Sequence, residues 1–143
     1  MNRPFDGAKL ALFVGDRLAV ILRDDRPDIP WPGYWDLPGG GREGEETPLA
    51  CALRETREEL GLGIDPSAVG WGKCFAVDGR DRWFFAVHLP AEVSAQIRLG
   101  SEGQRWALMQ PSAFLEHRKA VPSLKERLRI YLADVPGDII NRA

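Results

Sequence analysis

Residues 40–62 read GGREGEETPLACALRETREELGL, a glycine-rich loop that runs into a segment of helical character. Thr47 suits the N-cap position, because its hydroxyl oxygen can accept a hydrogen bond from a free backbone N–H of the first turn. Pro48 suits the first helical position, where the missing N–H of proline has no partner to lose. Gly61 suits the left-handed residue that ends many helices. These signals predict a helix from Pro48 to Leu60.

The predicted helix has an apolar stripe on one side. Its residues recur at spacings of four, three and four, which places them on one face of a helix. They are Leu49, Leu53, Thr56 and Leu60. We expect this face to be buried.

The same helix has an acidic face made of Glu55, Glu58 and Glu59, which fall within about 100° of arc at the helical repeat. Like charges at these spacings destabilise an isolated helix. Glu45 and Glu46 add two further carboxylates in the preceding loop. Hard divalent cations such as Mg²⁺ and Mn²⁺ prefer oxygen ligands and would explain the cluster. A solvated acidic helix face is the alternative.

The stretch resembles the Nudix box, a motif of glycine, five residues, glutamate, seven residues, then Arg-Glu-hydrophobic-any-Glu-Glu-any-Gly-hydrophobic. The matching positions are Gly40, Glu46, Arg54, Glu55, Glu58, Glu59, Gly61 and Leu62. Thr56 stands in a hydrophobic slot of the motif, where its methyl group can pack. The length and specificity of the match favour a metal site over a solvated face.

The resemblance implies an α/β sandwich in which a mixed sheet lies between helices, and we expect a single domain over residues 1–143. It also implies an enzyme that hydrolyses a phosphoanhydride bond in a nucleoside diphosphate linked to another group, X. Mg²⁺ is the expected cofactor, and Mn²⁺ is expected to substitute for it. In the family, the segment before the box offers a backbone carbonyl to a metal, and Gly39 is the matching position.

The box residues are expected to divide the work of this reaction. Glu58 and Glu59 are the first choices as metal ligands. Glu55 lies one turn earlier on the same face, and it can bind a metal or take the proton of the attacking water. Glu46 can support either role from the loop. Arg54 is expected to orient a carboxylate, with Glu58 four residues later as a partner.

A further acidic candidate lies late in the chain. Many members of the family carry an acidic residue in a loop before a Trp-containing strand, where it binds metal or acts as the base. Glu102, which precedes Trp106 in this way, resembles that feature. A surface charge on the loop is the alternative.

Composition restricts the class of protein further. The 143 residues are 44% hydrophobic and 28% charged, as in soluble globular proteins. No run is long enough to span a membrane, and the N-terminus lacks an apolar signal core, so we expect a cytoplasmic protein without a membrane partner. Cys51 and Cys74 are expected to be free thiols. The net charge of −2 disfavours nucleic acid as a partner, and we expect a monomer or homodimer that acts on a small nucleotide.

The rest of the chain predicts several strands and two more helices. Apolar runs bounded by turn residues predict strands at Lys9–Val14, Arg17–Arg23, Val69–Val77, Arg82–Leu89 and Gln104–Met109, with hairpin turns at Gly15-Asp16 and Asp78-Gly79. Shorter stretches predict a strand at Trp35 and Leu37, a helical turn at Ala91–Gln96 and an edge strand at Ile97–Leu99. Helices are predicted at Pro111–His117 and at Leu124–Ala133, the latter after a capping box formed by Ser123 and Glu126, with Leu124, Leu128, Ile130 and Tyr131 turned inward.

Aromatic side chains are candidates for stacking on a nucleobase, namely Trp31, Tyr34, Trp35 and Trp83. Trp83 adjoins Phe84 and Phe85 in a cluster that is otherwise expected in the core. The proline-rich loop at residues 24–33 is either a plain connector or a wall or lid of the substrate site. His88 and His117 are isolated from each other and are expected to be structural or surface residues.

The box does not identify X. A compact chain resembles the small nucleoside triphosphate pyrophosphohydrolases more than the larger ADP-ribose enzymes. ADP-ribose and dinucleoside polyphosphates are alternatives, and capped RNA ends are disfavoured by the acidic balance. A non-catalytic domain that senses a nucleotide is an alternative of another class. Such a domain would be expected to lose box carboxylates, and here all of them are present.

Overall fold

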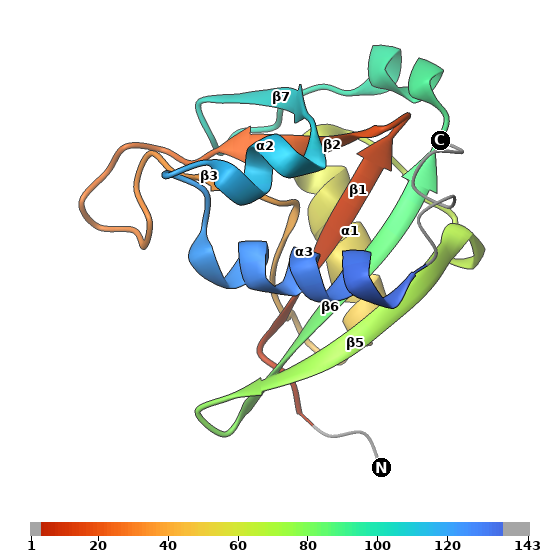
Figure 1. Cartoon of the computed structure of the whole chain (residues 1–143). Helices are drawn as coiled ribbons and strands as arrows, with labels where there is room; N and C mark the ends of the chain where they lie inside the picture. Colours follow the sequence, from red (N-terminus) through yellow and green to blue (C-terminus); the bar gives the residue numbers. More distant parts are fainter. Residues whose placement is uncertain (1–3, 136–143) are drawn as a thin grey trace.

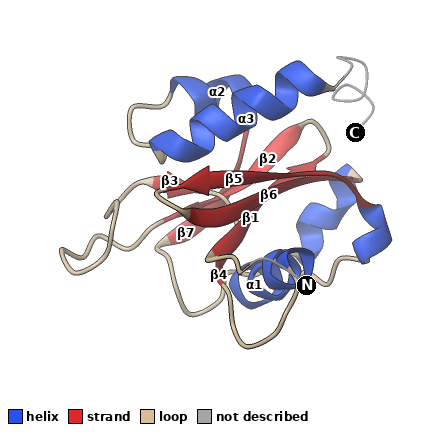
Figure 2. Cartoon of the chain, turned by 90° about the horizontal axis from the view of Figure 1, so that it is seen from below, coloured by secondary structure: helices blue, strands red, loops and turns tan. Residues whose placement is uncertain are grey.

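The computed structural model describes residues 4–135; residues 1–3 and 136–143 of the predicted domain lie outside this part. A seven-stranded sheet has helices on both faces (Figures 1 and 2). The strands are β1 (Gly7–Val14), β2 (Arg17–Leu22), β3 (Trp35–Asp36), β4 (Gly39–Gly41), β5 (Val69–Val77), β6 (Arg80–Leu89) and β7 (Arg105–Met109). The helices are α1 (Pro48–Leu60), α2 (Pro111–Glu116) and α3 (Pro122–Asp134), with short 3₁₀ helices η1 (Pro66–Ala68) and η2 (Ala91–Gln96). The predicted α/β class is confirmed.

The sheet is mixed because β1 has both parallel and antiparallel neighbours. β1 and β6 run parallel, with Leu10 opposite Phe85. β1 and β2 form an antiparallel hairpin around the predicted turn at Gly15-Asp16, and β5 and β6 form another around Asp78-Gly79. The order is β3-β2-β1-β6-β5, while β4 pairs with β1 and β7 pairs with β2. β1 therefore lies at the centre and carries the glycine strand β4.

Two apolar cores lie on opposite faces of the sheet. On one face α1 packs through residues that include Leu60, and on the other α2 and α3 pack through residues that include Phe114 and Leu128; Figure 2 shows these two layers. β1 serves both cores because successive side chains point to opposite faces, with Leu12 on the α1 side and Phe13 on the α3 side. Burial on both faces explains its nearly continuous apolar sequence.

The helix predicted from the box is α1, with the same bounds. Thr47 Oγ1 accepts a hydrogen bond from Ala50 N at 3.2 Å, and Gly61 ends the helix with a φ of 71°. Thr56 is fully buried. Its hydroxyl donates to the carbonyl of Ala52 at 2.8 Å, which gives the polar atom in this apolar slot a partner.

Strand β4 consists of three glycines, Gly39–Gly41, at the start of the box, and the sequence did not predict it. β4 pairs with β1 so closely that a Cβ on Gly39 would lie 2.2 Å from the carbonyl oxygen of Ala8. The φ of Gly39 is 132°, a conformation that residues with a Cβ rarely adopt. Glycine is therefore required here, and it brings the loop backbone next to α1.

Three predictions in the later part of the chain are wrong. Ile97–Leu99 is not a strand, because Arg98 N donates to the carbonyl of Leu60 at the end of α1 instead of pairing with the sheet. α3 begins at Pro122 without any side-chain cap, so Ser123 does not form a capping box. Ile130 is not part of the core against α3, whereas Arg127 is buried.

The two cysteines and His88 agree with the predictions made for them. Cys51 and Cys74 are thiols outside any disulfide, and burial, with the charge of Glu46 second, raises the pKa of Cys51 to about 11. The His88 ring stacks on Phe13 with 4.3 Å between centroids.

Among the described helices, none has the length and apolar character needed to cross a membrane.

Candidate active site

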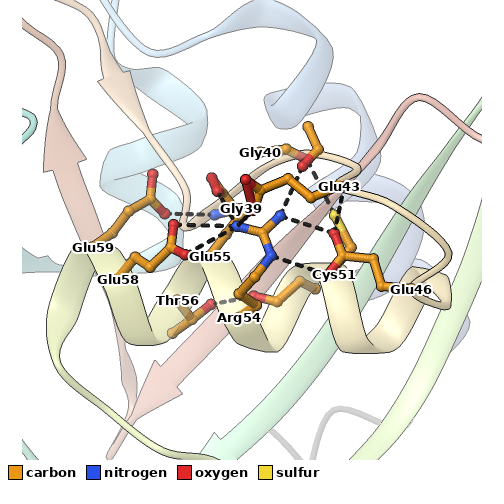
Figure 3. A network of polar contacts seen from close by, with 12 residues as sticks. Gly39, Gly40, Glu43, Glu46, Cys51, Arg54, Glu55, Thr56, Glu58 and Glu59 are labelled. Carbon is orange, nitrogen blue, oxygen red and sulfur yellow. Dashed lines mark hydrogen bonds and ion pairs between the residues drawn. The ribbon is translucent and has the colours of Figure 1, made fainter.

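Arg54 is the centre of the polar network on α1 (Figure 3). Its Nε and Nη2 atoms each donate to one oxygen of Glu46, both at 2.9 Å. Nη1 donates to Glu55 at 2.8 Å and to both oxygens of Glu58 at 3.2 Å. Nη2 also donates to the carbonyl of Gly41 at 2.9 Å. The predicted contact with Glu58 is confirmed, and Arg54 in addition ties the glycine loop to the helix.

Glu46 is held as an anion by this network. Its side chain is 14% exposed, and the hydrogen bonds from Arg54 lower its pKa to about 2. Glu43 N donates to the same carboxylate at 2.7 Å. Because both oxygens of Glu46 already have partners, its chemistry here is that of an anchor for Arg54.

Glu55 lies directly beneath the glycine strand. A Cβ on Gly40 would come 2.0 Å from Glu55 Oε2, so only glycine leaves room for this carboxylate. Burial raises the pKa of Glu55, against the opposing effect of Arg54. A carboxylate with a raised pKa and a fixed orientation is suited to accept a proton.

Glu59 is the most enclosed carboxylate of the acidic face. Its Oε1 accepts a hydrogen bond from Gly39 N at 2.8 Å. Burial raises the pKa of Glu59 to about 7, although Lys9 and the Gly39 N–H both favour the charged form. Glu59 and Gly39, both predicted as ligands, are therefore adjacent.

A second polar cluster beside Gly39 was not predicted from the sequence. Lys9 Nζ donates to Asp36 Oδ2 and to the carbonyls of Leu37 and Gly39, each at 3.1 Å. Arg23 Nη1 donates to the same oxygen of Asp36 at 2.8 Å. The only sequence signal was that Lys9 is a charged residue at the start of an apolar strand.

The donor atoms of this region suit a hard divalent cation. Glu55, Glu58 and Glu59 offer carboxylate oxygens and Gly39 a carbonyl oxygen, which are the ligands that Mg²⁺ prefers. The Gly39 carbonyl already faces one cation, the Lys9 ammonium group. Within residues 4–135, however, no three His, Cys, Asp or Glu side chains are gathered as a metal site. Arg54 accounts for this in part, because it binds both oxygens of Glu58, and metal binding by Glu58 would require that side chain to turn away from Arg54.

Two cavities open beside this network. The larger, about 410 Å³, extends from Lys9 and the glycine strand to α3. The smaller, about 160 Å³, is lined by Glu59 and Glu102. Arg23 and Asp36 line both cavities and form the boundary between them.

Of the four aromatic candidates, Trp31 is the most available to a ligand. It is 44% exposed and lines the larger cavity. Trp83 lines the same cavity, but its ring stacks on Phe85 with 5.7 Å between centroids. Tyr34 lines neither cavity. Trp35 is 7% exposed and belongs to the core against α3, so the expectation that it stacks on a base is wrong.

The proline-rich loop at residues 24–33 is a wall of both cavities and not only a connector. Asp24 Oδ2 accepts a hydrogen bond from Gly103 N at 3.2 Å, which joins this loop to the segment that carries Glu102. Glu102 is exposed at the mouth of the smaller cavity. It therefore lies on the same side of the molecule as Glu59, and Asp24 is a residue of this region that the sequence did not single out.

The mixed sheet, the glycine strand and the acidic helix define a class of fold, and comparison with known proteins identifies the family. The sequence matches the NUDIX domain family over residues 6–131. The chain therefore belongs to the NUDIX family.

Two of the relatives match over shorter stretches. An RNA pyrophosphohydrolase of Halorhodospira halophila is 39% identical over 57 residues, which are 36% of this chain and 32% of that protein. The putative 8-oxo-dGTP diphosphatase 3 of Mycobacterium tuberculosis is 39% identical over 59 residues, 32% of this chain and 27% of that protein. The chain thus matches about a third or less of each relative's length. The MutT protein from Methanosarcina mazei Go1 has the same fold, with a TM-score of 0.71 over 94% of this chain and 97% of that chain, at 16% identity.

The buried charge of Glu59 makes a prediction for the metal-free protein. Glu59→Gln is expected to raise the Tm in EDTA at pH 8 by several degrees, because the folded wild type must carry this carboxylate in an enclosed site. A pKa of about 7 in place of 4.5 corresponds to a cost of at most about 3 kcal/mol. Since the folded state binds the proton more tightly, this cost shrinks as the pH falls from 7, and the advantage of the variant should vanish near the unfolded pKa.

Thermal unfolding of wild type and variant between pH 5 and pH 8 measures this difference. Glu58→Gln is the matched control, because Glu58 is exposed, and its Tm should change little at any pH. If Glu59→Gln instead lost many degrees at pH 8, the carboxylate would be a structural element of the fold.

Proposed function

We propose that the protein hydrolyses a phosphoanhydride bond in a nucleoside diphosphate linked to another group, with a nucleoside triphosphate as substrate and pyrophosphate as product. Mg²⁺ is the proposed cofactor, with Mn²⁺ as a substitute. The observation that carries the proposal is the position of Glu55, Glu58 and Glu59 on one face of α1, with Glu55 against the glycine strand and Glu59 at the wall of the smaller cavity. Family membership supports the same reaction class.

The box residues divide into holders of the cation and positioners. Glu58, Glu59 and the carbonyl of Gly39 would hold the metal. A divalent cation bound there neutralises charge on phosphoanhydride oxygens and acidifies the attacking water. Glu55 is the proposed base, and Arg54, at 2.8 Å from its Oε1, orients it. Arg54 binds only Oε1 of Glu55, so Oε2 would take the proton of the water.

The larger cavity is the proposed site of the nucleoside. Trp31 offers an exposed aromatic face to a base. Lys9 and Arg23 lie between this cavity and Glu59, where their positive charges would attract the phosphates. The substrate would then run from the wall formed by Trp31 towards the acidic face of α1.

A panel of substrates with Mg²⁺ and product identification tests the proposal. The panel contains nucleoside triphosphates, deoxynucleoside triphosphates, ADP-ribose, a dinucleoside polyphosphate and a 5′-triphosphorylated RNA, the last because one relative is named as an RNA pyrophosphohydrolase. Release of pyrophosphate from a triphosphate is the expected result. If only another member of the panel were hydrolysed, that compound would take the place of the triphosphate as the proposed substrate. A shift in Tm without any turnover would show that the protein senses nucleotides and is not a hydrolase.

Glu102 is expected to contribute less than the box. It is exposed and approaches the site only at the mouth of the smaller cavity, so Glu102→Gln should lower kcat by no more than about tenfold, or about 1.4 kcal/mol. Steady-state rates for Glu102→Gln beside Glu55→Gln, Glu58→Gln and Glu59→Gln provide the comparison. If Glu102→Gln were the most damaging of the four, the base would lie in the late loop and α1 would be scaffold.

A further inference from the structure

Arg127 lies at the α3 end of the larger cavity, far along the wall from the box. Its side chain is 93% buried, since only 7% of its surface is exposed, and it is one of the residues that line the cavity. Its guanidinium lies over the ring of Phe75, 5.2 Å from the centroid. Within residues 4–135, burial and the charge of Arg82 act on the Arg127 guanidinium, and no carboxylate acts on it.

An enclosed guanidinium without an anion is unfavourable. Burial, and second the charge of Arg82, lower the pKa of Arg127 from its ordinary value. Buried charges are usually paired, because removing a charge from water costs several kcal/mol unless a partner compensates. The cation–π contact with Phe75 offsets only a part of this cost. Arg127 is thus a cation without a carboxylate partner among the described residues, at the wall of a cavity of about 410 Å³.

The two carboxylates that line the cavity, Asp36 and Asp6, form ion pairs with other cations. Asp36 is bound by Lys9 and Arg23, and Asp6 is paired with Arg80 at 3.3 Å. Arg82, which also lines the cavity, adds a second positive charge near Arg127. Within residues 4–135, the cavity therefore has a positively charged end at α3 that is suited to bind an anionic group of a ligand.

We propose that Arg127, supported by Arg82, binds an anionic substituent of the substrate remote from the bond that is broken. This substituent is a phosphate monoester or a carboxylate, carried by the ribose or by X. A guanidinium recognises both groups with two parallel hydrogen bonds. The inference rests on the proposed hydrolysis of a nucleoside diphosphate derivative, and it predicts that the site prefers those derivatives that carry one further anion.

Metal-free binding of matched ligand pairs tests the inference. NADPH and NADH differ by a ribose phosphate, and UDP-glucuronate and UDP-glucose differ by a carboxylate on X. Calorimetry in EDTA should show the member with the additional anion bound about 10–100-fold more tightly than the member without it, in one of the two pairs, as expected for hydrogen bonds to a charged group. The pair that shows the difference identifies which anion is recognised.

Arg127→Met should remove this preference and leave the affinity for the member without the additional anion within about twofold. Arg127→Lys should retain part of the preference. Arg129→Met is the matched control, because Arg129 is exposed on the same helix, and it should leave the preference intact. Loss of an unpaired buried cation should not lower the metal-free Tm, and if Arg127→Met fails to fold, Arg127→Lys carries the test.

Equal affinity for both members of each pair in the wild type would overturn the inference. So would an equal loss for both members in Arg127→Met, or no binding of any member. The test is separate from that of the proposed function. Turnover of triphosphates without an anion preference would reject this inference alone, whereas an anion preference without any turnover would reject the hydrolase.

Discussion

Replacing Glu59 with glutamine is expected to abolish at least one metal site and to lower nucleotide turnover by at least about 100-fold. Mutation of a group that only supports a metal ligand already lowers activity by about 10–100-fold, and Glu59 is a proposed ligand itself. Glu59 lies closest to the Gly39 backbone, with 2.8 Å between Gly39 N and Glu59 Oε1. The neutral amide of glutamine keeps the shape of the side chain but removes its charge. Metal affinity and rate should therefore fall together.

Glu55→Gln is expected to behave differently if Glu55 is the base. Loss of a general base typically lowers the rate by about 10²–10⁴-fold, and metal affinity should then be nearly retained. Mn²⁺ titrations by calorimetry beside steady-state rates separate the two outcomes. Glu92→Gln, on the exposed surface of η2, is the control and should match the wild type. Retained metal binding in Glu59→Gln would show that the cation is held elsewhere.

Replacing Arg54 with methionine is the second change with a large expected effect. Arg54 joins Glu46, Glu55, Glu58 and the Gly41 carbonyl, so its loss leaves several carboxylates without a cation between them. Because the side chain of Arg54 is partly exposed, we expect the free energy of unfolding to fall by about 2–4 kcal/mol, somewhat less than for a fully buried ion pair. Turnover should fall as well, since Glu55 loses the group that orients it.

Arg57→Met is the control for this change, because Arg57 lies on the same helix and is exposed. Its stability in urea and its turnover should stay close to those of the wild type. The pH dependence provides a second check. The hydrogen bonds from Arg54 lower the pKa of Glu46 to about 2, so this stabilisation is present above the unfolded pKa of Glu46 and is lost as the pH falls towards 2. A stability difference between wild type and Arg54→Met that grew on acidification would contradict this account.

The box helix could be predicted to the residue because its ends depend on local chemistry. Thr47, Pro48 and Gly61 each act on backbone groups within one turn, and all three behave as predicted. The contact between Arg54 and Glu58 follows from the same reasoning, because four residues make one turn. The predicted start of α3 is wrong because Pro122 takes the first helical position. Ser123 is therefore inside the helix and is not its N-cap residue.

The parts of the site that depend on tertiary structure could not be predicted in this way. Lys9, Arg23 and Asp36 come from three separate places in the chain, and only strand pairing brings them together. Arg127 lies on α3 in a sequence that reads as an ordinary amphipathic helix, so its burial had no local signal. The sequence does not show that Trp35 is buried. Side chains of a short strand alternate between two faces, and the alternation alone does not tell which face is covered.

The most direct measurement of the central claim is the turnover of the best nucleotide substrate with Mg²⁺, with excess EDTA, and after Mg²⁺ is restored. The arrangement of Glu55, Glu58, Glu59 and the Gly39 carbonyl predicts release of pyrophosphate with Mg²⁺, loss of turnover in EDTA and recovery when the metal returns. Full turnover in excess EDTA would contradict it, and the acidic face of α1 would then have another purpose.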